Sequence, residues 1–415
     1  MSLTHRMRSI FGDPLLVVCV MAMSIFGAAM IYSAGQLDVP DFAAEGAWEQ
    51  QVLFIGISLV VLLVVMRIPV RWLEWIAVPA YIGGLILLAV TLVIGGGAGT
   101  AASMKGWIRV GGFNVQPAQF ANVATVLMLG RIMGNWREHP QTIWVLWKPI
   151  AVTVVPMLMV LAQPDLGTAL VFGGVLLATI FWAGTPLGLM FLLMSPVLGL
   201  AFAYVGTWIY SIYMLILIAF LYLYRARTSE VVAVLALNLV MGTIAWPLWN
   251  SLEPYQQSRI ISFADPTHDP RGAGYQVLQS KVAIGSGGIY GQGWLDGPQK
   301  RLKFLPEQHT DFIYAVIGEE MGLIGAGAVL VVYFLILWRL VRLAERLADP
   351  FAGIVVFGIV GAWFTHIVVN VGMTLGVMPV TGIPLPFLSY GGSFLLASFI
   401  ALGVAQRVAL EQGRI

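Results

Sequence analysis

The chain has 415 residues, of which 59% are hydrophobic and only 10% are charged. Soluble domains contain about 45–50% apolar and about 25% charged residues, so a soluble globular fold is excluded and lipid must cover most of the surface. A net charge of +2 gives no basis for a nucleic-acid partner, and the single Cys19 excludes an intramolecular disulfide and a cysteine-based zinc site.

Twelve apolar segments are long enough to cross a bilayer as helices, which need about 20 residues. They predict an all-α polytopic membrane protein. The first segment is too long for a cleaved signal sequence, so we expect it to remain as a membrane anchor. In chain order the segments are 15–34, 50–66, 72–94, 117–134, 143–162, 166–183, 187–205, 208–224, 231–249, 312–338, 352–376 and 387–408.

The distribution of Lys and Arg orients these spans, because cytoplasmic loops are richer in both residues. With the N-terminus inside, the inside segments hold 14 of the 22 Lys and Arg residues, whereas the short outside loops hold only Lys105 and Arg109. Both termini are therefore expected in the cytoplasm. The segments 95–117 and 250–311 then lie outside the membrane, and the second is by far the longer.

The segment 95–117 contains seven glycines, two cations and a tryptophan. One interpretation is a flexible connector in which Trp107 anchors the chain at the membrane interface. The other is a phosphate site, where Lys105 and Arg109 supply positive charge and glycine lets backbone N–H groups approach the ligand. The spacing alone leaves both interpretations open.

The segment 250–311 combines carboxylates, cations and glycines. Two Asp-Pro pairs, at Asp265 and Asp269, predict turns that hold carboxylates in irregular backbone. The apolar stretch 275–284, which carries Lys281, is expected to lie along the membrane surface, and the glycines of 285–293 would let backbone pack closely against a ligand. A carboxylate base, cations for a phosphate leaving group and a lipid-facing groove suit a transferase that acts on a polyprenyl-phosphate-linked substrate.

The predicted spans contain almost no ionisable residues, although an ion-coupled transporter usually needs them at mid-membrane depth. His366 is the main exception. Asn370 lies one turn later on the same helix face, and this pair more often forms satisfied interhelical hydrogen bonds than a functional site. The active surface is therefore expected at the outer leaflet.

Several short motifs occur in one order over nearly the whole chain. They comprise Lys105, Trp107, Gln116 and Pro117; Gln163, Asp165, Gly167 and Thr168; Asp269, Gly272, Gly274 and Tyr275; Gln279, Ser280, Lys281, Gly285, Ser286 and Gly288; Phe304, Pro306, Glu307, His309, Thr310, Asp311 and Phe312; Gly318, Glu319 and Glu320; and the stretch 384–393. Together they resemble the SEDS family (shape, elongation, division and sporulation), the RodA/FtsW peptidoglycan glycosyltransferases, and more closely its RodA branch. That family has a core of ten spans, so the resemblance implies an inserted helical pair, which we place at 206–249.

The resemblance implies polymerisation of lipid II into glycan strands at the outer face of the cytoplasmic (inner) membrane, for cell elongation and shape. The family's essential aspartate stands in the string D-P-x-G-x-G-Y, which places it at Asp269 and not at Asp265. Implied partners are the growing glycan strand, a class B penicillin-binding protein and other membrane proteins of the elongation complex. Candidate substrate-binding residues are Lys105, Trp107, Arg109, Gln116, Asp165, Lys281, Ser286, His309, Asp311 and Glu319.

The change of anomeric configuration in this chemistry calls for one in-line displacement with a single base, for which Asp269 is the candidate. Lys105, Arg109 and Lys281 are candidates to neutralise the leaving undecaprenyl pyrophosphate. No tightly bound cofactor is expected, and a divalent cation, Mg²⁺ or Mn²⁺, would arrive with the pyrophosphate. The alternative function is a lipid II flippase, and a scaffold that only recruits other wall enzymes is a third.

Two further features bear on the resemblance. Relatives usually have Q-P-S/A-E followed by a lysine, whereas this chain has Gln119 and Asn122 at these positions, so no charged role is assigned to this helix. Gly318, Gly322 and Gly325 form a strip on which either a partner's membrane helix or the protein's own chain would pack closely.

Overall fold

The computed structural model describes residues 11–38, 46–97, 105–265, 272–305 and 307–412. In this part of the chain a helix forms at each of the twelve predicted spans. Ten of the described helices are long and apolar enough to cross a membrane, α7 is a shorter apolar helix, and α5 is short and carries polar residues. These helices are α2 (Pro14–Gly35), α3 (Ala47–Val65), α4 (Val70–Ile94), α5 (Pro117–Met133), α6 (Trp147–Leu161), α7 (Leu166–Trp182), α8 (Leu187–Val205), α9 (Thr207–Tyr224), α10 (Thr228–Ser251), α14 (Ile313–Arg346), α15 (Pro350–Thr374) and α16 (Gly392–Gln412).

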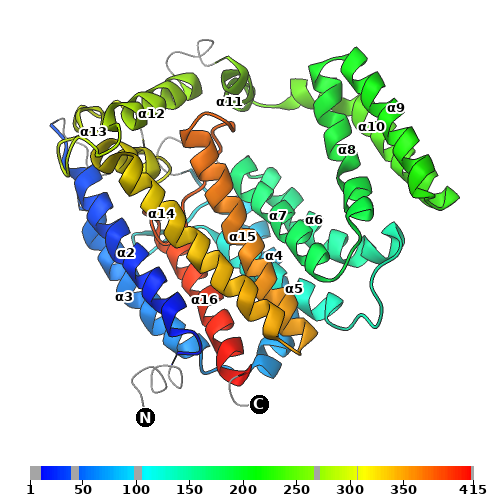
Figure 1. Cartoon of the computed structure of the whole chain (residues 1–415), viewed down its shortest axis with the longest axis horizontal. Coiled ribbons are helices and arrows are strands. Elements are labelled where there is room, and N and C mark those ends of the chain that lie inside the picture. The colour runs from blue at the N-terminus through cyan, green and yellow to red at the C-terminus, as the bar shows by residue number, and fades with distance from the viewer. Residues whose placement is uncertain (1–10, 39–45, 98–104, 266–271, 306, 413–415) are drawn as a thin grey trace.

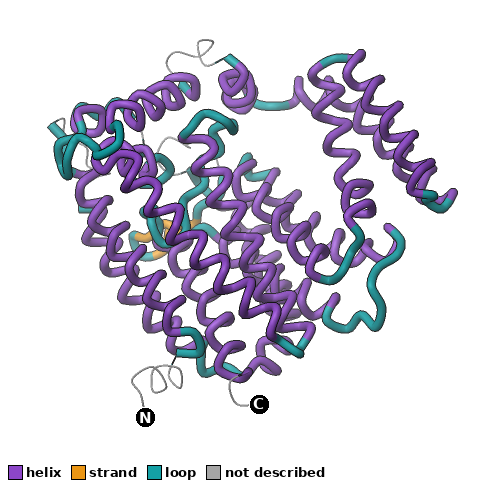
Figure 2. Tube along the Cα trace, viewed as in Figure 1, coloured by secondary structure: helices purple, strands orange, loops and turns teal. Residues whose placement is uncertain are grey.

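The remaining elements are short and lie between the spans. They are the strands β1 (Ile108–Val110) and β2 (Phe113–Val115), the 3-10 helix η1 (Ile143–Leu146), and the helices α11 (Pro254–Ala264), α12 (Ala273–Gly287) and α13 (Pro298–Arg301). The strands form an antiparallel hairpin among the helices (Figure 2). Gly111 and Gly112 occupy its turn at φ +56° and +87°, the two positive values that a type I′ turn requires.

Carboxylate caps and prolines start several membrane helices. Asp13 and Asp349 precede Pro14 and Pro350, and each carboxylate accepts a hydrogen bond from a backbone N–H of the first turn. Asp165 starts α7 in the same way by accepting from the Thr168 N–H. Proline suits the first helical position because its missing N–H would have no partner there.

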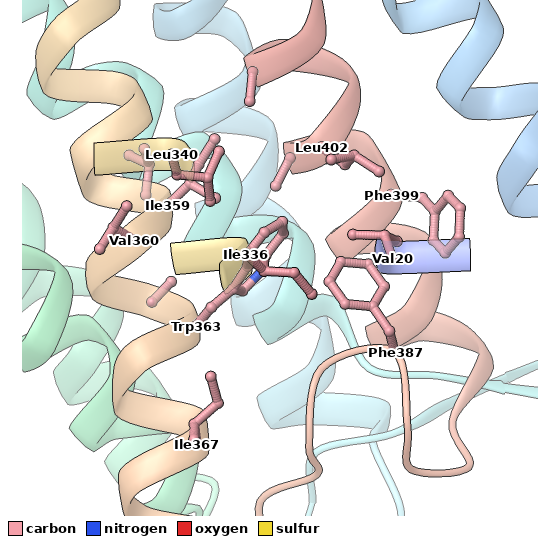
Figure 3. Close-up of a cluster of buried hydrophobic side chains, with 14 of the residues drawn as sticks. Val20, Ile336, Leu340, Ile359, Val360, Trp363, Ile367, Phe387, Phe399 and Leu402 are labelled. Carbon is pink, nitrogen blue, oxygen red and sulfur yellow. The ribbon is translucent and has the colours of Figure 1, made fainter. Parts of the chain in front are cut away.

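Helix α15 is the centre of the bundle. In its apolar stretch 78% of the residues are buried, against 17% in α9 and α10, which leave most of their surface to lipid. It packs on α5, α7 and α14, and the core continues onto α2 and α16 (Figure 3). There Phe387 meets Trp363 and Phe399 edge to face, with ring centroids 4.9 Å and 5.5 Å apart.

Helices α8, α9 and α10 form a separate three-helix unit beside this bundle (Figure 1). A cluster of hydrogen-bonded polar side chains joins the three helices among their apolar residues. The Tyr213 hydroxyl lies 2.6 Å from the Ser195 carbonyl and 3.0 Å from Asn238 Oδ1, and Asn238 Nδ2 donates to Ser195 Oγ at 3.0 Å. Such bonds hold helices together where lipid provides no hydrophobic driving force.

Helix α14 breaks at Gly322, whose φ of +63° and ψ of −161° are not helical. Backbone of the preceding glycine-rich segment enters the break. Leu323 N donates to the Gly288 carbonyl at 2.9 Å, and a Cβ on Gly322 would lie 2.4 Å from Gly291 N. Gly318 packs on Ile284 of α12. At Gly318 and Gly322 the glycine strip is therefore covered by the protein's own chain, which favours the second of the two interpretations for these two positions.

The first and last described helices meet at one end of the molecule, and the short helices between the spans lie at the other. The start of α2 and the end of α16 lie together, where Asp13 N donates to Gln406 Oε1 at 2.7 Å and Asp13 pairs with Arg339 at 2.7 Å. Helices α11, α12 and α13 lie at the opposite end, over the ends of α14 and α15 (Figure 1). This arrangement fits an even number of crossings and gathers the predicted site residues at one end.

Candidate functional site

The site is built around the starts of α5 and α7. Gln116, which precedes α5, donates from Nε2 to Asp165 Oδ2 at 3.0 Å, and the Thr168 N–H donates to Asp165 Oδ1 at 2.9 Å. Gln119 Nε2 donates in turn to Gln116 Oε1 at 3.0 Å. Gln116 and Asp165 are only 6% and 4% exposed. Two residues predicted from separate motifs therefore form one buried hydrogen-bonded unit.

A second acid faces this unit. Burial raises the pKa of Asp311 to about 7, with the charges of Glu307 and Asp165 adding to the increase and Arg259 opposing it. Burial likewise raises the pKa of Asp165, against hydrogen bonds from Thr168 and Gln116 and the charge of Arg259. The structure thus brings together two predicted acids, Asp165 and Asp311. The cation that interacts with both is Arg259, which was not predicted as a site residue.

The turn 381–383 separates the two acids. Gly382 has a φ of +73°, and a Cβ on it would lie 3.1 Å from Asp311 Oδ2. Asn370 Nδ2 donates to the carbonyls of Asp311 at 2.8 Å and Ile383 at 2.7 Å, and Arg259 Nη1 lies 3.5 Å from the Thr381 carbonyl. Glycine is needed here because a side chain would both strain the backbone and enter the space of the acid.

The interhelical hydrogen bonds predicted for His366 and Asn370 are wrong: both side chains bind carbonyls outside the helices, and Asn370 Oδ1 is buried without a hydrogen-bond partner in the described part of the chain. His366 Nδ1 lies 3.0 Å from the Pro384 carbonyl, and Asn370 binds the carbonyls described above. The two side chains therefore hold the chain that follows α15 against the start of α14, and so shape the wall of the site.

Besides Gln116, three residues were predicted in 95–117, and one of them is joined to the site by its backbone. Lys105 N donates to the Gln163 carbonyl at 3.3 Å, two residues before Asp165, and its side chain is exposed. Trp107 pairs with Gly96 in an isolated bridge, and Arg109 stands exposed on β1 opposite Asn114. Residues 108–115 form a hairpin that leads directly into Gln116, and the exposed cations Lys105 and Arg109 lie just before it and on its first strand.

His309 lies beside Tyr390 at the edge of the site. Its carbonyl accepts from Tyr390 N at 3.0 Å, and the two rings lie 5.5 Å apart. Tyr390 Oη donates to Gln50 Oε1 at 2.5 Å, and burial raises the pKa of this phenol. His309 is 6% exposed, so it is part of the buried wall formed with Tyr390.

The two residues predicted on α12 differ in their surroundings. Lys281 is exposed and its stem lies against Gly376 after α15, while the neighbouring Ser280 donates to the Thr374 carbonyl at 2.8 Å. Ser286 donates to the Ala283 carbonyl of its own helix at 2.8 Å. Lys281 therefore presents an exposed cation at the C-terminal end of α15, whereas the hydroxyl of Ser286 is used within α12.

Glu319 lies apart from the acid pair and caps α13. Its carboxylate accepts from Gln299 N at 2.7 Å and from Lys300 N at 3.2 Å. Beside it Lys300 and Glu320 form a fully buried ion pair at 2.5 Å, and Ser33 Oγ donates to Glu320 Oε1 at 2.5 Å. This polar cluster fixes the segment before α14 to α2 and α14.

Asp269, the predicted base, lies outside the described residues. The chain on either side of it belongs to α11, which ends at Ala264, and α12, which begins at Ala273. Asp265 follows α11 directly, donates from its N–H to the Ile261 carbonyl at 2.9 Å and is exposed. Among the described residues no three His, Cys, Asp or Glu side chains gather as a metal site.

Two cavities lie beside the residues that are hydrogen-bonded to Gln116. An apolar one of about 130 Å³ is bordered by α3, β2, α5 and the start of α16, where Ser393 Oγ accepts from Gln116 N at 3.1 Å. Its apolar lining residues are Phe54, Ile57, Phe113, Val115, Phe120 and Leu396. The other, of about 30 Å³, lies between α5, α15 and α16 and is lined in part by Gln119, Asn122 and His366.

Comparisons with known proteins agree over almost the whole chain. The family model for the FtsW/RodA/SpoVE cell cycle proteins matches residues 13–213 and 189–413. The peptidoglycan glycosyltransferase RodA of Treponema pallidum (strain Nichols) is 33% identical over 428 residues, which cover 96% of this chain and 98% of the relative. The peptidoglycan glycosyltransferase MrdB of Escherichia coli (strain K12) is 33% identical and covers 95% of this chain and 93% of its own.

Solved structures give the same answer for the fold. A chain from work on the structural coordination of polymerization and crosslinking by a peptidoglycan synthase complex is 27% identical, with a TM-score of 0.70 over 97% of this chain and 99% of that one. The rod shape determining protein RodA of Thermus thermophilus is 25% identical, with a TM-score of 0.62 over 96% and 97%. The chain is thus a multi-pass membrane protein that belongs to the FtsW/RodA/SpoVE family.

Proposed function

We propose that this protein polymerises lipid II into glycan strands at the outer face of the cytoplasmic membrane, for cell elongation and shape. It is a peptidoglycan glycosyltransferase, the enzyme class named for its relatives in Treponema pallidum and Escherichia coli. The observation that carries the proposal is the buried pair Gln116 and Asp165, which interacts with the partly exposed Asp311 and Arg259. It lies at the end of the bundle where α11 and α12 flank the segment of Asp269.

In the proposed reaction Asp269 acts as the base. Its carboxylate accepts the proton of the acceptor sugar's 4-hydroxyl while that oxygen attacks the anomeric carbon of the donor. The bond from this carbon to the pyrophosphate oxygen breaks, and undecaprenyl pyrophosphate leaves with the electron pair. A base within hydrogen-bond reach contributes roughly 10²–10⁴-fold to the rate.

The growing negative charge on the pyrophosphate needs fixed cations. Lys105, Arg109 and Lys281 are exposed at this end of the molecule, so their ammonium and guanidinium groups are available to the leaving group. A Mg²⁺ or Mn²⁺ ion that accompanies the pyrophosphate is part of the proposal as an ion carried by the substrate. Adding a chelator to the assay tests that part separately.

The remaining candidates shape the acceptor and donor sites. Asp165 and Gln116 are buried in contact with each other, His309 is buried and Asp311 is partly exposed, and all four offer hydrogen-bond acceptors or donors to sugar hydroxyls, with Trp107 as an apolar surface at the hairpin. The apolar cavity beside Ser393 is proposed to hold the first isoprene units of the lipid. Ser286 and Glu319 already bond within α12 and to α13, which supports an indirect role for both.

The orientation and the partner follow from charge and from the relatives. Because 14 of 22 Lys and Arg residues fall on the side of the termini, that side is assigned to the cytoplasm. The structural relative from a peptidoglycan synthase complex supports a penicillin-binding protein as partner. That it is of class B, and that other proteins of the elongation complex also bind, is part of the proposal. The pair α9 and α10, which packs on α8, is proposed to be the inserted segment 206–249.

The experiment uses purified full-length protein, fluorescent lipid II and a cognate class B penicillin-binding protein whose transpeptidase is blocked. Glycan polymer on a gel supports the proposed function. The absence of polymer, combined with lipid II transport across reconstituted vesicles, would contradict it and favour the flippase. Absence of both activities would leave the scaffold function.

A further inference from the structure

The smaller cavity, between α5, α15 and α16, is polar on one side. Gln119, Asn122 and His366 line it together with apolar residues such as Trp363 and Phe394. Its volume of about 30 Å³ exceeds the roughly 10–15 Å³ that a single water needs, and it is too small for a sugar or a lipid group. This volume matches one or two water molecules.

The side-chain amide of Asn122 is the first indication that a molecule occupies the cavity. It is 6% exposed, and its Nδ2 is a buried donor that has no hydrogen-bond partner in the described part of the chain. An amide buried without a partner loses its hydration and gains nothing in exchange, which is why such groups are rare in folded proteins. A water in the adjoining cavity would satisfy it.

His366 supplies the matching acceptor. Its Nδ1 lies 3.0 Å from the Pro384 carbonyl, which can only accept, so Nδ1 carries the hydrogen. In the neutral ring Nε2 then has a free lone pair. The ring also lies against Phe394, with centroids 4.5 Å apart, which fixes its orientation.

Gln119 connects the cavity to the candidate site. Its Nε2 donates to Gln116 Oε1, and Gln116 Nε2 donates to Asp165 Oδ2, both at 3.0 Å. Both of these bonds run toward the carboxylate and use neither hydrogen-bond acceptor site of the Gln119 carbonyl oxygen, which can therefore accept from the cavity. The orientation of both amides therefore depends on what binds that oxygen.

We propose that this cavity holds an ordered water that accepts from Asn122 Nδ2 and donates to His366 Nε2 and Gln119 Oε1, and that it fixes the amide chain that ends on Asp165. Three polar partners are typical of a buried structural water. Asn122 is then a positioning residue that acts through Gln119 and Gln116. The existence of the water site does not depend on the proposed function. The effect of the water on the reaction rests on the proposed function.

The first experiment is a map of the full-length protein at a resolution that shows waters, for the wild type, Asn122→Leu and Thr125→Val. Thr125 is a matched control, because it lies on the same helix, is fully buried and uses its hydroxyl on the Ala121 carbonyl at 2.8 Å. We expect a density peak within about 2.7–3.2 Å of Asn122 Nδ2 in the wild type and the control, and none in Asn122→Leu. An empty wild-type cavity would overturn the proposal.

The second experiment is the pH dependence of polymerisation. A bond from Gln116 favours the ionised form of Asp165, and Asp311 and Arg259 are the other charged groups that face it. Weakening one hydrogen bond should therefore lower the rate of Asn122→Leu about fivefold on the acid side and less at pH 8. A variant that lacks the water but keeps the wild-type pH profile would overturn the positioning role. If the wild-type protein shows the water but makes no glycan polymer, the water site is supported and the proposed function is contradicted.

Discussion

Replacing Asp311 by asparagine tests the most perturbed acid of the site. Burial raises its pKa from the ordinary 3.8 to about 7, so protons bind it more tightly in the folded than in the unfolded chain. The folded state therefore loses stability as the pH rises from about 4 through about 7. Asparagine keeps the size of the side chain but carries no charge, and it should relieve this cost wherever the aspartate would ionise.

The size of the effect follows from the same shift. At about 1.4 kcal/mol per pKa unit, ionised Asp311 would cost about 4 kcal/mol in free energy of unfolding, and the partial exposure of the side chain lowers this to roughly 2–4 kcal/mol. An unfolding entropy of about 2.1 cal/mol/K per residue converts this into a melting temperature higher by roughly 2–5 °C at pH 8. At pH 4 the difference should be close to zero.

The assay is thermal unfolding of detergent-solubilised full-length protein at pH 4, 6 and 8. Asp38→Asn is the control, because Asp38 is about half exposed and pairs with Arg301 at 3.0 Å, a contact whose loss should cost little. Asp311→Asn should also lose polymerisation activity. Together, the two results would show that Asp311 is needed for activity although it lowers the stability of the protein. An Asp311→Asn variant whose melting temperature shows the same offset at pH 4 and pH 8 would refute the reasoning.

Three further predictions concern the framework. Lys300→Met should lower the free energy of unfolding by about 3–5 kcal/mol because it leaves Glu320 buried without its cation, and Lys300→Met with Glu320→Leu should recover most of the loss in the same melts. Gly322→Ala should cost at least about 1–3 kcal/mol through its positive φ, more once the clash with residue 291 is added, and full stability would contradict the break in α14. In a chain without Cys19, a cysteine at Ser258 should react with an impermeant thiol reagent in cells with an opened outer barrier and one at Ser229 should not, and the reverse pattern would overturn the orientation.

Much of the architecture was accessible from the sequence because lipid imposes a simple rule. Apolar runs of about 20 residues must become helices, and all twelve predicted runs did so in the described residues. The cap that Asp165 provides for α7 was not predicted, although Asp before an apolar run is a common start of a helix. The proximity of Gln116 and Asp165 was implied only by the resemblance, since nothing in their spacing brings α5 beside α7.

What the sequence missed depends on contacts between distant segments. Arg259 gave no local signal, because its importance comes from Asp165 and Asp311, which lie on other elements. The break in α14 was hidden for the same reason: Gly322 leaves the helix only where backbone of 288–291 supplies partners. Glu319 matched a motif, yet its two bonds go to the start of α13.

The central claim is that Asp269, and not Asp265, is the base of a glycan polymerase. The most direct test is the polymerisation rate of Asp269→Asn and Asp265→Asn, each purified with the blocked class B penicillin-binding protein and supplied with fluorescent lipid II. Asp269→Asn should fold, bind its partner and lose at least about 10²-fold in rate, which corresponds to about 2.7 kcal/mol of transition-state stabilisation, while Asp265→Asn keeps measurable polymer. Equal rates in the two variants, or loss in Asp265→Asn alone, would contradict the account.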